Sequence, residues 1–490
     1  MSSVRRALAL SFIERYFSIV VALGSSMLLA RLLTPEQIGM YSVSLAVIGI
    51  AHVLREFGVG NFLIQQKDLN DNHVRTAFGL ALVLGGTLAL VIYAAAPWVA
   101  RFYDAPEMAG LMRIVALNFL VLPFCSISLS LLRRDMKFKA LLYVSLGALL
   151  LSTAVTLGLA WAGYGPTSLA VGSVVGNVAT GFGAWWARGR PALLRPGWRE
   201  WRVVLNFGGQ SAVTGIVTSV AMDINDLVVG KVLGFAPVAI LSRAQGLMNM
   251  VHRDLMGAVR NVALPAFSQG HRDGVALEPV CIKATGYLIV VTWPFYALLS
   301  AYALEATRLL FGPQWDAAAA LVPIFCATGA AVALVSIVPS ALIAVGRIDL
   351  VTKFELTMQP LRIAITVFAV VTWQTVEAAA IAYLLSGVIG VPLMLAIKHQ
   401  AIKIDFLATW VEIRRAIIAT LIAVVPAIAH LAFGQRSDTG TLPVWQVMIA
   451  GALGIFGWVV ALVATRHPLM QEPFVLRVLE KTPWMRLRVK

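Results

Sequence analysis

Apolar runs of about 20 residues recur along the whole chain and are separated by short polar segments. A bilayer core is about 30 Å thick, and a helix needs about 20 apolar residues to cross it. Because backbone groups in lipid must bond within their own segment, runs of this length indicate helices, whereas barrel strands are shorter and alternate. The pattern predicts an all-α polytopic membrane protein with about fourteen transmembrane helices. Their expected spans are 11–33, 38–57, 77–99, 109–132, 140–162, 166–187, 203–230, 237–260, 280–303, 317–344, 350–373, 377–397, 415–433 and 443–465.

A stripe of polar residues lies on the first run and recurs on the seventh. Positions spaced by three, four and seven residues share one face of a helix. The first stripe is Ser11, Glu14, Ser18 and Ser25, and the second, 200 residues later, is Ser211, Thr214, Thr218 and Asn225. The same offset pairs Arg31 with Lys231. We interpret the two stretches as one structural unit used twice.

The duplication continues beyond these stripes. Arg101 and Pro106 precede the fourth run in the way that Arg308 and Pro313 precede the tenth. Six plus six spans in a parallel repeat are therefore expected, and transporters of this kind bind substrate between their halves. The predicted divisions are an N-lobe at 1–190, a C-lobe at 200–400, two extra helices at 410–465 and a basic tail at 466–490.

The composition supports a membrane protein, and the distribution of charge predicts its orientation in the membrane. Hydrophobic residues make up 59% of the chain and charged residues 13%, with a mean hydropathy of +0.83, against roughly 45–50% and about 25% in soluble domains. Most of the 39 Lys and Arg residues fall on one side of the expected helices, the side that the positive-inside rule makes cytoplasmic. An even number of spans with both termini in the cytoplasm follows. Topology then explains the net charge of +15 without nucleic acid as a partner.

The sequence lacks the common motifs of enzymes. Cys125, Cys281 and Cys326 show no ligand spacing, the seven histidines form no helical pair, and no phosphate-binding Gly-Lys-Ser/Thr loop occurs. The segments between spans are too short for a catalytic domain outside the membrane. We therefore expect a protein that is not an enzyme and binds no metal or cofactor.

Two other segments indicate packing and membrane contact. Gly172 and Gly176 form a small-residue pair that is typical of closely packed membrane helices. The tail from 471 to 490 mixes apolar residues with five cations, so it is expected to lie on the cytoplasmic membrane surface rather than to bind a partner.

Charged residues inside the expected spans indicate a functional site. A charge at mid-bilayer costs about 2.5 kcal/mol or more, so such groups face a wet cavity or a partner. The candidates for a cationic cavity are Arg15, Arg31, Arg243 and Arg362, with the stripe residues Ser18, Thr218 and Asn225 as further lining. A guanidinium stays charged and offers a planar fork of donors, which suits a diphosphate. The polar stripes fit interhelical hydrogen bonds equally well.

Three acids could couple transport to an ion. Glu14, Asp223 and Asp226 lie in or near the same spans and could exchange protons. The alternative is that Glu14 pairs with a neighbouring helix and the two aspartates cap a helix end near water. A proton or sodium gradient as the driving force therefore stays one of two interpretations.

Several motifs resemble one family. The chain is similar to the polysaccharide-transporter flippases of bacterial envelopes, in the multidrug/oligosaccharidyl-lipid/polysaccharide exporter superfamily. The matching segments are Ala30-Arg31-Leu32-Leu33-Thr34-Pro35-Glu36-Gln37-Ile38-Gly39-Met40-Tyr41, Phe57-Gly58-Val59-Gly60, Asp226-Leu227-Val228-Val229-Gly230-Lys231-Val232-Leu233-Gly234, Ser242-Arg243-Ala244 and Leu264-Pro265-Ala266-Phe267-Ser268. One departure is Ala239-Ile240-Leu241, where the family usually has a glycine and a tyrosine.

The resemblance implies a two-lobed, V-shaped transporter that alternates access. Its cargo would be an undecaprenyl-diphosphate-linked oligosaccharide repeat unit, moved across the bacterial inner membrane for exopolysaccharide, colanic-acid-like or O-antigen synthesis. Arg15, Arg31 and Arg243 would then contact the diphosphate or acidic sugars. The expected partners are this glycan, membrane lipids and a polysaccharide polymerase or co-polymerase, and the expected state is a monomer.

Other functions make different demands on the sequence. A drug or cation antiporter of the same fold would need acids deep in a lobe, whereas the deep charges here are mostly arginine. A membrane-embedded glycan polymerase or ligase would need a sizeable outer loop. A flippase for a lipid-linked peptidoglycan precursor differs only in its cargo, so it stays the nearest alternative.

Overall fold

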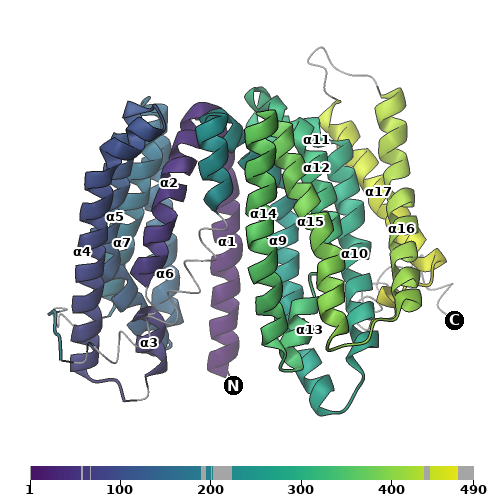
Figure 1. The fold of residues 1–490 in the computed structure, drawn as a ribbon, viewed down its shortest axis with the longest axis horizontal. Helices are drawn as coiled ribbons and strands as arrows, with labels where there is room; N and C mark the ends of the chain where they lie inside the picture. Colours follow the sequence, from purple (N-terminus) through teal and green to yellow (C-terminus); the bar gives the residue numbers. More distant parts are fainter. Residues whose placement is uncertain are drawn as a thin grey trace. The chain divides into compact units, whose positions relative to one another are not determined.

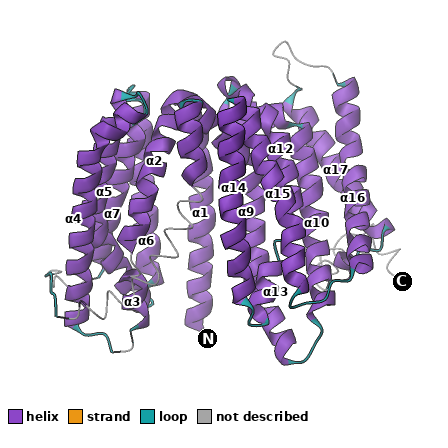
Figure 2. Ribbon diagram, in the orientation of Figure 1, coloured by secondary structure: helices purple, strands orange, loops and turns teal. Residues whose placement is uncertain are grey.

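The computed structural model describes residues 2–56, 59–66, 68–188, 195–199, 201, 223–434 and 442–472. Every regular element in these ranges is helical, and none is a strand (Figure 2). Ten helical segments within them are long and apolar enough to cross a bilayer. The chain is therefore an all-helical, multi-pass membrane protein, as its hydrophobic pattern predicted. The count of fourteen spans stays a prediction.

The chain divides into two units, Met1–Ala239 and Ile240–Lys490. In the first unit α4 packs on α5, α5 on α7, and α7 on α6, while α1 lies against α6 (Figure 1). Its labelled helices are α1 (Ser2–Leu32), α2 (Pro35–Glu56), α3 (Val59–Gln65), α4 (Asp71–Phe102), α5 (Pro106–Arg134), α6 (Phe138–Trp161) and α7 (Thr167–Ala187).

The second unit repeats this order of packing. Helix α10 packs on α12, α12 on α15 and α15 on α14, and α16 and α17 are added beside α10. Its elements are α9 (Phe235–Arg272), which begins in the first unit, α10 (Leu277–Ala301), α11 (Ala303–Phe311), η1 (Pro313–Trp315), α12 (Asp316–Ala333), α13 (Val338–Ala344), α14 (Ile348–Trp373), α15 (Val376–His399), α16 (Phe406–Phe433), α17 (Val444–Ala464) and η2 (Pro468–Gln471). The matching order agrees with an internal duplication, although the six-plus-six division into lobes stays a prediction.

Small residues let α6 and α7 approach closely. A Cβ at Gly172 would lie 1.7 Å from Thr156 Oγ1, and one at Gly176 would lie 2.9 Å from Ser152 Cβ. Ser152 uses the proximity to donate a hydrogen bond of 2.8 Å to the Gly172 carbonyl. The glycine pair therefore packs two helices together, in the role that its spacing indicated.

The tenth expected span, 317–344, is not one continuous helix. Helix α12 ends at Ala333, residues 334–337 form turns, and α13 begins at Val338. Pro339 lies in the first turn of α13, where no helical hydrogen bond requires its missing backbone N–H. The span itself is confirmed, because the segment Pro313–Ala344 as a whole is long and apolar enough to cross a bilayer.

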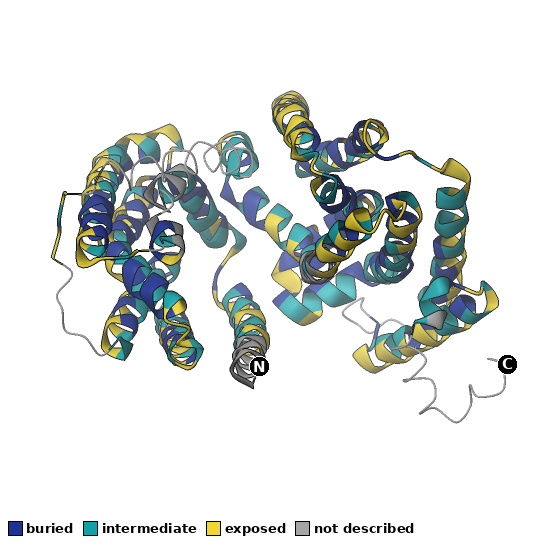
Figure 3. Cartoon of the chain, turned by 90° about the horizontal axis from the view of Figure 1, so that it is seen from below, coloured by how far each residue is buried: buried dark blue, intermediate teal, exposed yellow. Residues whose placement is uncertain are grey.

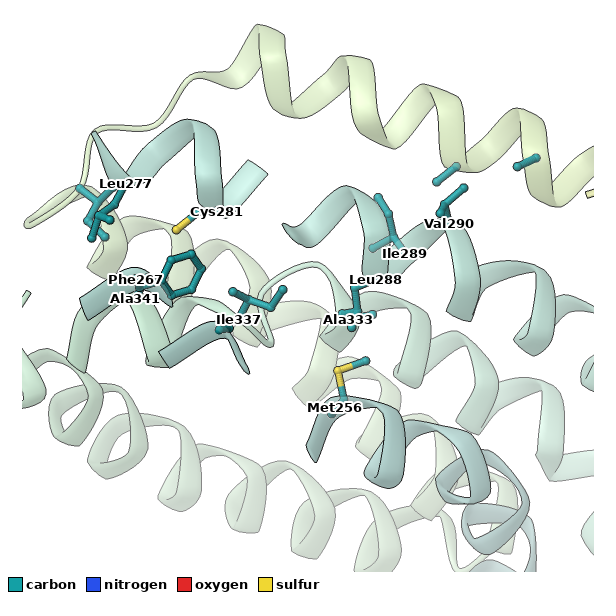
Figure 4. Packing of buried hydrophobic residues seen from close by; sticks show 14 of the residues in the cluster. Met256, Phe267, Leu277, Cys281, Leu288, Ile289, Val290, Ala333, Ile337 and Ala341 are labelled. Atoms are coloured by element: carbon teal, nitrogen blue, oxygen red, sulfur yellow. The ribbon is translucent and has the colours of Figure 1, made fainter. Parts of the chain in front are cut away.

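The second unit has a core of apolar side chains from several helices. Met256 and Phe267 of α9 lie with Leu288 and Ile289 of α10 and with Ile337, which precedes α13 (Figure 4). In Figure 3 buried residues lie on helix sides that face neighbours in the same unit, and exposed residues lie on outer sides. The outer sides are themselves apolar, which is typical of a surface that lipid covers.

Candidate functional site

Arg243 of α9 lies against two aromatic rings. Its guanidinium carbon is 4.9 Å from the centroid of Phe311 and 5.1 Å from that of Trp315. Trp315 is fully buried at the end of η1, so the ring is held in place. Cation–π contacts of this kind stabilise a cation away from water.

Arg362 of α14 is held in a similar way. Its guanidinium lies 5.5 Å from the centroid of Tyr383 on α15. The Tyr383 hydroxyl accepts a hydrogen bond of 3.0 Å from Gln245, two residues after Arg243 on α9. The arginine–aromatic cluster is the set Arg243, Gln245, Phe311, Trp315, Arg362 and Tyr383. It contains two predicted arginines of the second unit, each held against its own aromatic side chains.

An ion pair fixes the turn that carries the two aromatic residues. Arg308 of α11 donates from Nε and Nη2 to the carboxylate of Asp316, at 2.8 and 2.6 Å. This bidentate pair spans the turn between α11 and α12, in which Phe311 and Trp315 lie. We infer that Arg308 and Asp316 position the rings under Arg243.

The candidate residues of α1 lie in the first unit. Glu14 and Ser18 are half-buried, whereas Arg15 and Arg31 are exposed. Arg31 donates from Nη1 to the Met27 carbonyl at 3.0 Å, one turn earlier. Their membership of one cavity with Arg243 and Arg362 stays a prediction.

The other candidates come from the seventh expected span. Residues 223–232 are helical, and Asp223, Asn225 and Asp226 on them are half-buried. Asn225 Oδ1 is buried without a hydrogen-bond partner among the described residues. Thr218 lies outside the described residues. The structure brings the two aspartates onto one helix face, three residues apart, and their coupling to protons stays a prediction.

The family-like motifs meet at the starts of α2 and α9, a contact that sequence reasoning did not foresee. Glu36 Oε2 accepts a hydrogen bond of 2.9 Å from the backbone N–H of Ala236, which is 200 residues later in the chain. A Cβ at Gly39 would lie 1.8 Å from the Phe235 carbonyl oxygen, so only glycine allows this approach. Glu36 and Ala236 are separated by the same 200 residues that separate the two polar stripes, and this spacing was the signal that could have suggested the contact.

Lys231 and Tyr103 strengthen the same end of the first unit. Lys231 Nζ lies 3.0 Å from Asp104 and donates to the Phe102 carbonyl. Tyr103 donates its hydroxyl to the Leu227 carbonyl at 3.1 Å. These bonds tie helix 223–232 to the end of α4.

A group of ion pairs in the second unit was also missed. Lys398 Nζ of α15 lies 2.6 Å from Glu278 of α10, with side chains that are 6% and 13% exposed. Glu412 of α16 pairs with Arg415 at 2.5 Å and lies 3.3 Å from His467. In a sequence, charged residues at helix ends cannot be distinguished from charged residues in loops. Only the packing of the helices shows that these side chains are buried. Among the described residues no group of three or more His, Cys, Asp or Glu side chains could hold a metal ion.

The family described as "Polysaccharide biosynthesis protein" matches residues 28–320 of the chain. The lipopolysaccharide biosynthesis protein WzxC of Escherichia coli is 23% identical over 349 residues, 69% of each chain. The teichuronic acid biosynthesis protein TuaB of Bacillus subtilis is 21% identical over 79% of this chain and 80% of its own. The succinoglycan biosynthesis transport protein ExoT of Rhizobium meliloti is 24% identical over 59% and 58%.

Solved structures with the same fold are transporters. The lipid II flippase MurJ in an inward closed conformation matches with a TM-score of 0.75 and 13% identity, over 94% of this chain and 100% of its own. An inward-facing multidrug resistance MATE family transporter of the MOP superfamily matches with a TM-score of 0.61 and 13% identity, over 78% and 96%. At such identities the likeness describes the fold alone.

Proposed function

This chain belongs to the polysaccharide biosynthesis protein family, and on that basis we propose that it is a flippase for lipid-linked oligosaccharides. Its cargo is an undecaprenyl-diphosphate-linked repeat unit that crosses the bacterial inner membrane. The repeat unit serves exopolysaccharide, colanic-acid-like or O-antigen synthesis. Support comes from relatives named for lipopolysaccharide, teichuronic acid and succinoglycan synthesis.

The arginine–aromatic cluster is the observation that carries the proposal. A diphosphate head that crosses about 30 Å of hydrocarbon needs counter-charges on its path. Arg243 and Arg362 supply two permanent cations, each held against an aromatic ring. A drug cation would be repelled by this arrangement, because like charges in a low dielectric raise the free energy of the complex.

The remaining assignments follow from the same proposal. Arg15 and Arg31 contact the diphosphate or acidic sugars at another stage of transport, and Ser18, Thr218 and Asn225 line the polar path. Glu14, Asp223 and Asp226 exchange the protons or sodium ions of a driving gradient. The protein works as a monomer with cytoplasmic termini, opens its site to each side of the membrane in turn, and passes cargo to a polymerase or co-polymerase.

Transport in proteoliposomes tests the role of Arg243. The purified chain is reconstituted with a fluorescent undecaprenyl-diphosphate oligosaccharide, and the fraction exposed to an impermeant quencher is followed over time. Loss of a charge-assisted contact of about 1.5–3 kcal/mol predicts that Arg243→Ala slows transport about ten- to a hundredfold.

Arg113→Ala is the matched control. Arg113 also lies over an aromatic ring, 5.0 Å from the centroid of Tyr93, but it belongs to no candidate site. It should transport at the wild-type rate. Equal rates for both variants and the wild type would show that Arg243 is not on the transport path. If the protein transported only a peptidoglycan precursor, the proposed cargo would be wrong.

A further inference from the structure

A long apolar groove lies between α6 and α7 in the first unit. Its volume is about 730 Å³, and its walls come from both helices. Three aromatic side chains line it, Tyr143, Phe182 and Trp186, and they are 64%, 66% and 75% exposed. Gly172 and Gly176 bring α7 close to Ser152 and Thr156 of α6, next to the end of the groove at Leu151.

The groove is about as long as one leaflet of a bilayer. Its lining on α6 extends from Ala140 to Leu151, which at 1.5 Å per residue is about 16 Å. Half of a hydrocarbon core is about 15 Å. The antiparallel partner α7 closes the same end, because Ala187 lies in the lining with Ala140. The groove therefore starts at one membrane surface and ends near the midplane.

Two cationic residues lie at the end of the groove that is near the membrane surface. Lys139 precedes Ala140 and is exposed, with Nζ 5.9 Å from the centroid of Tyr143. Arg188 follows Ala187 and is half-buried. The nearby acid Asp135 lies 3.9 Å from Lys137 and so faces a different cation. The mouth of the groove has a positive charge, which complements an anionic headgroup.

A second groove lies on the other side of α7. It has a volume of about 430 Å³ and lies between α5 and α7. Val178 and Phe182 line both grooves, so they form a ridge between two apolar channels. Two parallel channels match the two acyl chains of a phospholipid, whereas a polyprenyl tail is a single chain and would leave one channel unfilled.

We propose that the two grooves beside α7 bind one anionic phospholipid. Its acyl chains lie on either side of Phe182, and its phosphate lies between Lys139 and Arg188. The positive-inside expectation puts this lipid in the cytoplasmic leaflet. The site is separate from the arginine–aromatic cluster, which lies in the second unit.

Native mass spectrometry of the purified full-length chain tests the proposal. Phosphatidylglycerol and phosphatidylethanolamine are titrated in competition, and one tightly retained phosphatidylglycerol is expected. Gly147 lines the first groove, and a Cβ there meets no atom within 4 Å, so Gly147→Leu fills the groove without a clash. A leucine that displaces about two methylene groups of the chain should weaken retention about tenfold.

Gly158→Leu is the control on the same helix. Its Cβ also meets no atom within 4 Å, but Gly158 does not line the groove. This variant should retain phosphatidylglycerol as the wild type does. Lys139→Gln should reduce the preference for phosphatidylglycerol about fivefold, the usual contribution of one lysine at an anionic surface.

Equal retention by the two leucine variants would overturn the proposal. An unchanged lipid preference in Lys139→Gln would also overturn it. If undecaprenyl phosphate displaces phosphatidylglycerol from the wild type at equal concentration, the groove holds a polyprenyl chain and the proposal is wrong.

Discussion

Arg243 and Arg362 differ in how firmly their surroundings hold them. Arg243 lies over two rings, and Arg362 lies over one ring, whose hydroxyl is itself hydrogen-bonded to Gln245. The sequence predicted both arginines because charges within apolar runs are costly. It did not predict Phe311, Trp315 or Tyr383, because an aromatic residue in an apolar run is normally assigned to the hydrophobic core. Only the structure shows the cation beside it.

Tyr383 separates the effect of the ring from that of the hydroxyl. Tyr383→Phe keeps the ring under Arg362 and removes the acceptor for Gln245. We expect it to lower the free energy of unfolding by about 0.5–1.5 kcal/mol and to leave the transport rate within about twofold. Tyr383→Leu removes the ring as well and should slow transport clearly more. Identical transport by the two variants would show that the stacking of Arg362 has no role.

The buried pair of Lys398 and Glu278 is predicted to be structural. Lys398→Met leaves the Glu278 carboxylate nearly buried beside an apolar chain, and breaking such a pair costs about 3–5 kcal/mol. Thermal unfolding in detergent should therefore show a large loss for Lys398→Met. Adding Glu278→Leu should recover most of it, since no charge is then left unpaired. A double variant as unstable as the single one would contradict this assignment.

The apolar runs predicted where the helices lie, but they did not show where a helix is interrupted. The runs at 109–132 and 140–162 became α5 and α6 with ends shifted by a few residues. The run at 317–344 became α12 and α13, which together still form one segment able to cross a bilayer. The turn between them, residues 334–337, is as apolar as the helices, so the sequence pattern did not show it. Helices α3 and α11 were not predicted, since each is too short to give a periodic signal.

The meeting of α2 and α9 depends on Gly39. A methyl group there would overlap the Phe235 carbonyl, so Gly39→Ala must separate the two helix starts at a cost of about 1–3 kcal/mol. We expect a lower unfolding temperature and slower transport in proteoliposomes. Gly110→Ala is the control, because a Cβ at Gly110 on α5 meets no atom within 4 Å. Its stability should equal or exceed that of the wild type by up to about 1 kcal/mol, and equal behaviour of the two variants would refute the packing argument.

For the whole molecule, the sequence predicted the fold class and the family, and the structure adds a common packing order. The order α4–α5–α7–α6 in the first unit matches α10–α12–α15–α14 in the second. The offset of 200 residues between two polar stripes hinted at this repetition. Side-chain contacts such as Arg243 on Trp315 could not be predicted, because they depend on turns that bring three separate elements together.

Transport of a lipid-linked repeat unit can be tested in a strain that lacks the gene. The undecaprenyl-linked glycan pool is extracted from that strain and assigned to each membrane face. We predict that one complete repeat unit accumulates on the cytoplasmic face while surface polymer is lost, and that Arg113→Ala restores export whereas Arg243→Ala does not. An unchanged pool, distributed over the two faces as in the wild type, would contradict the claim.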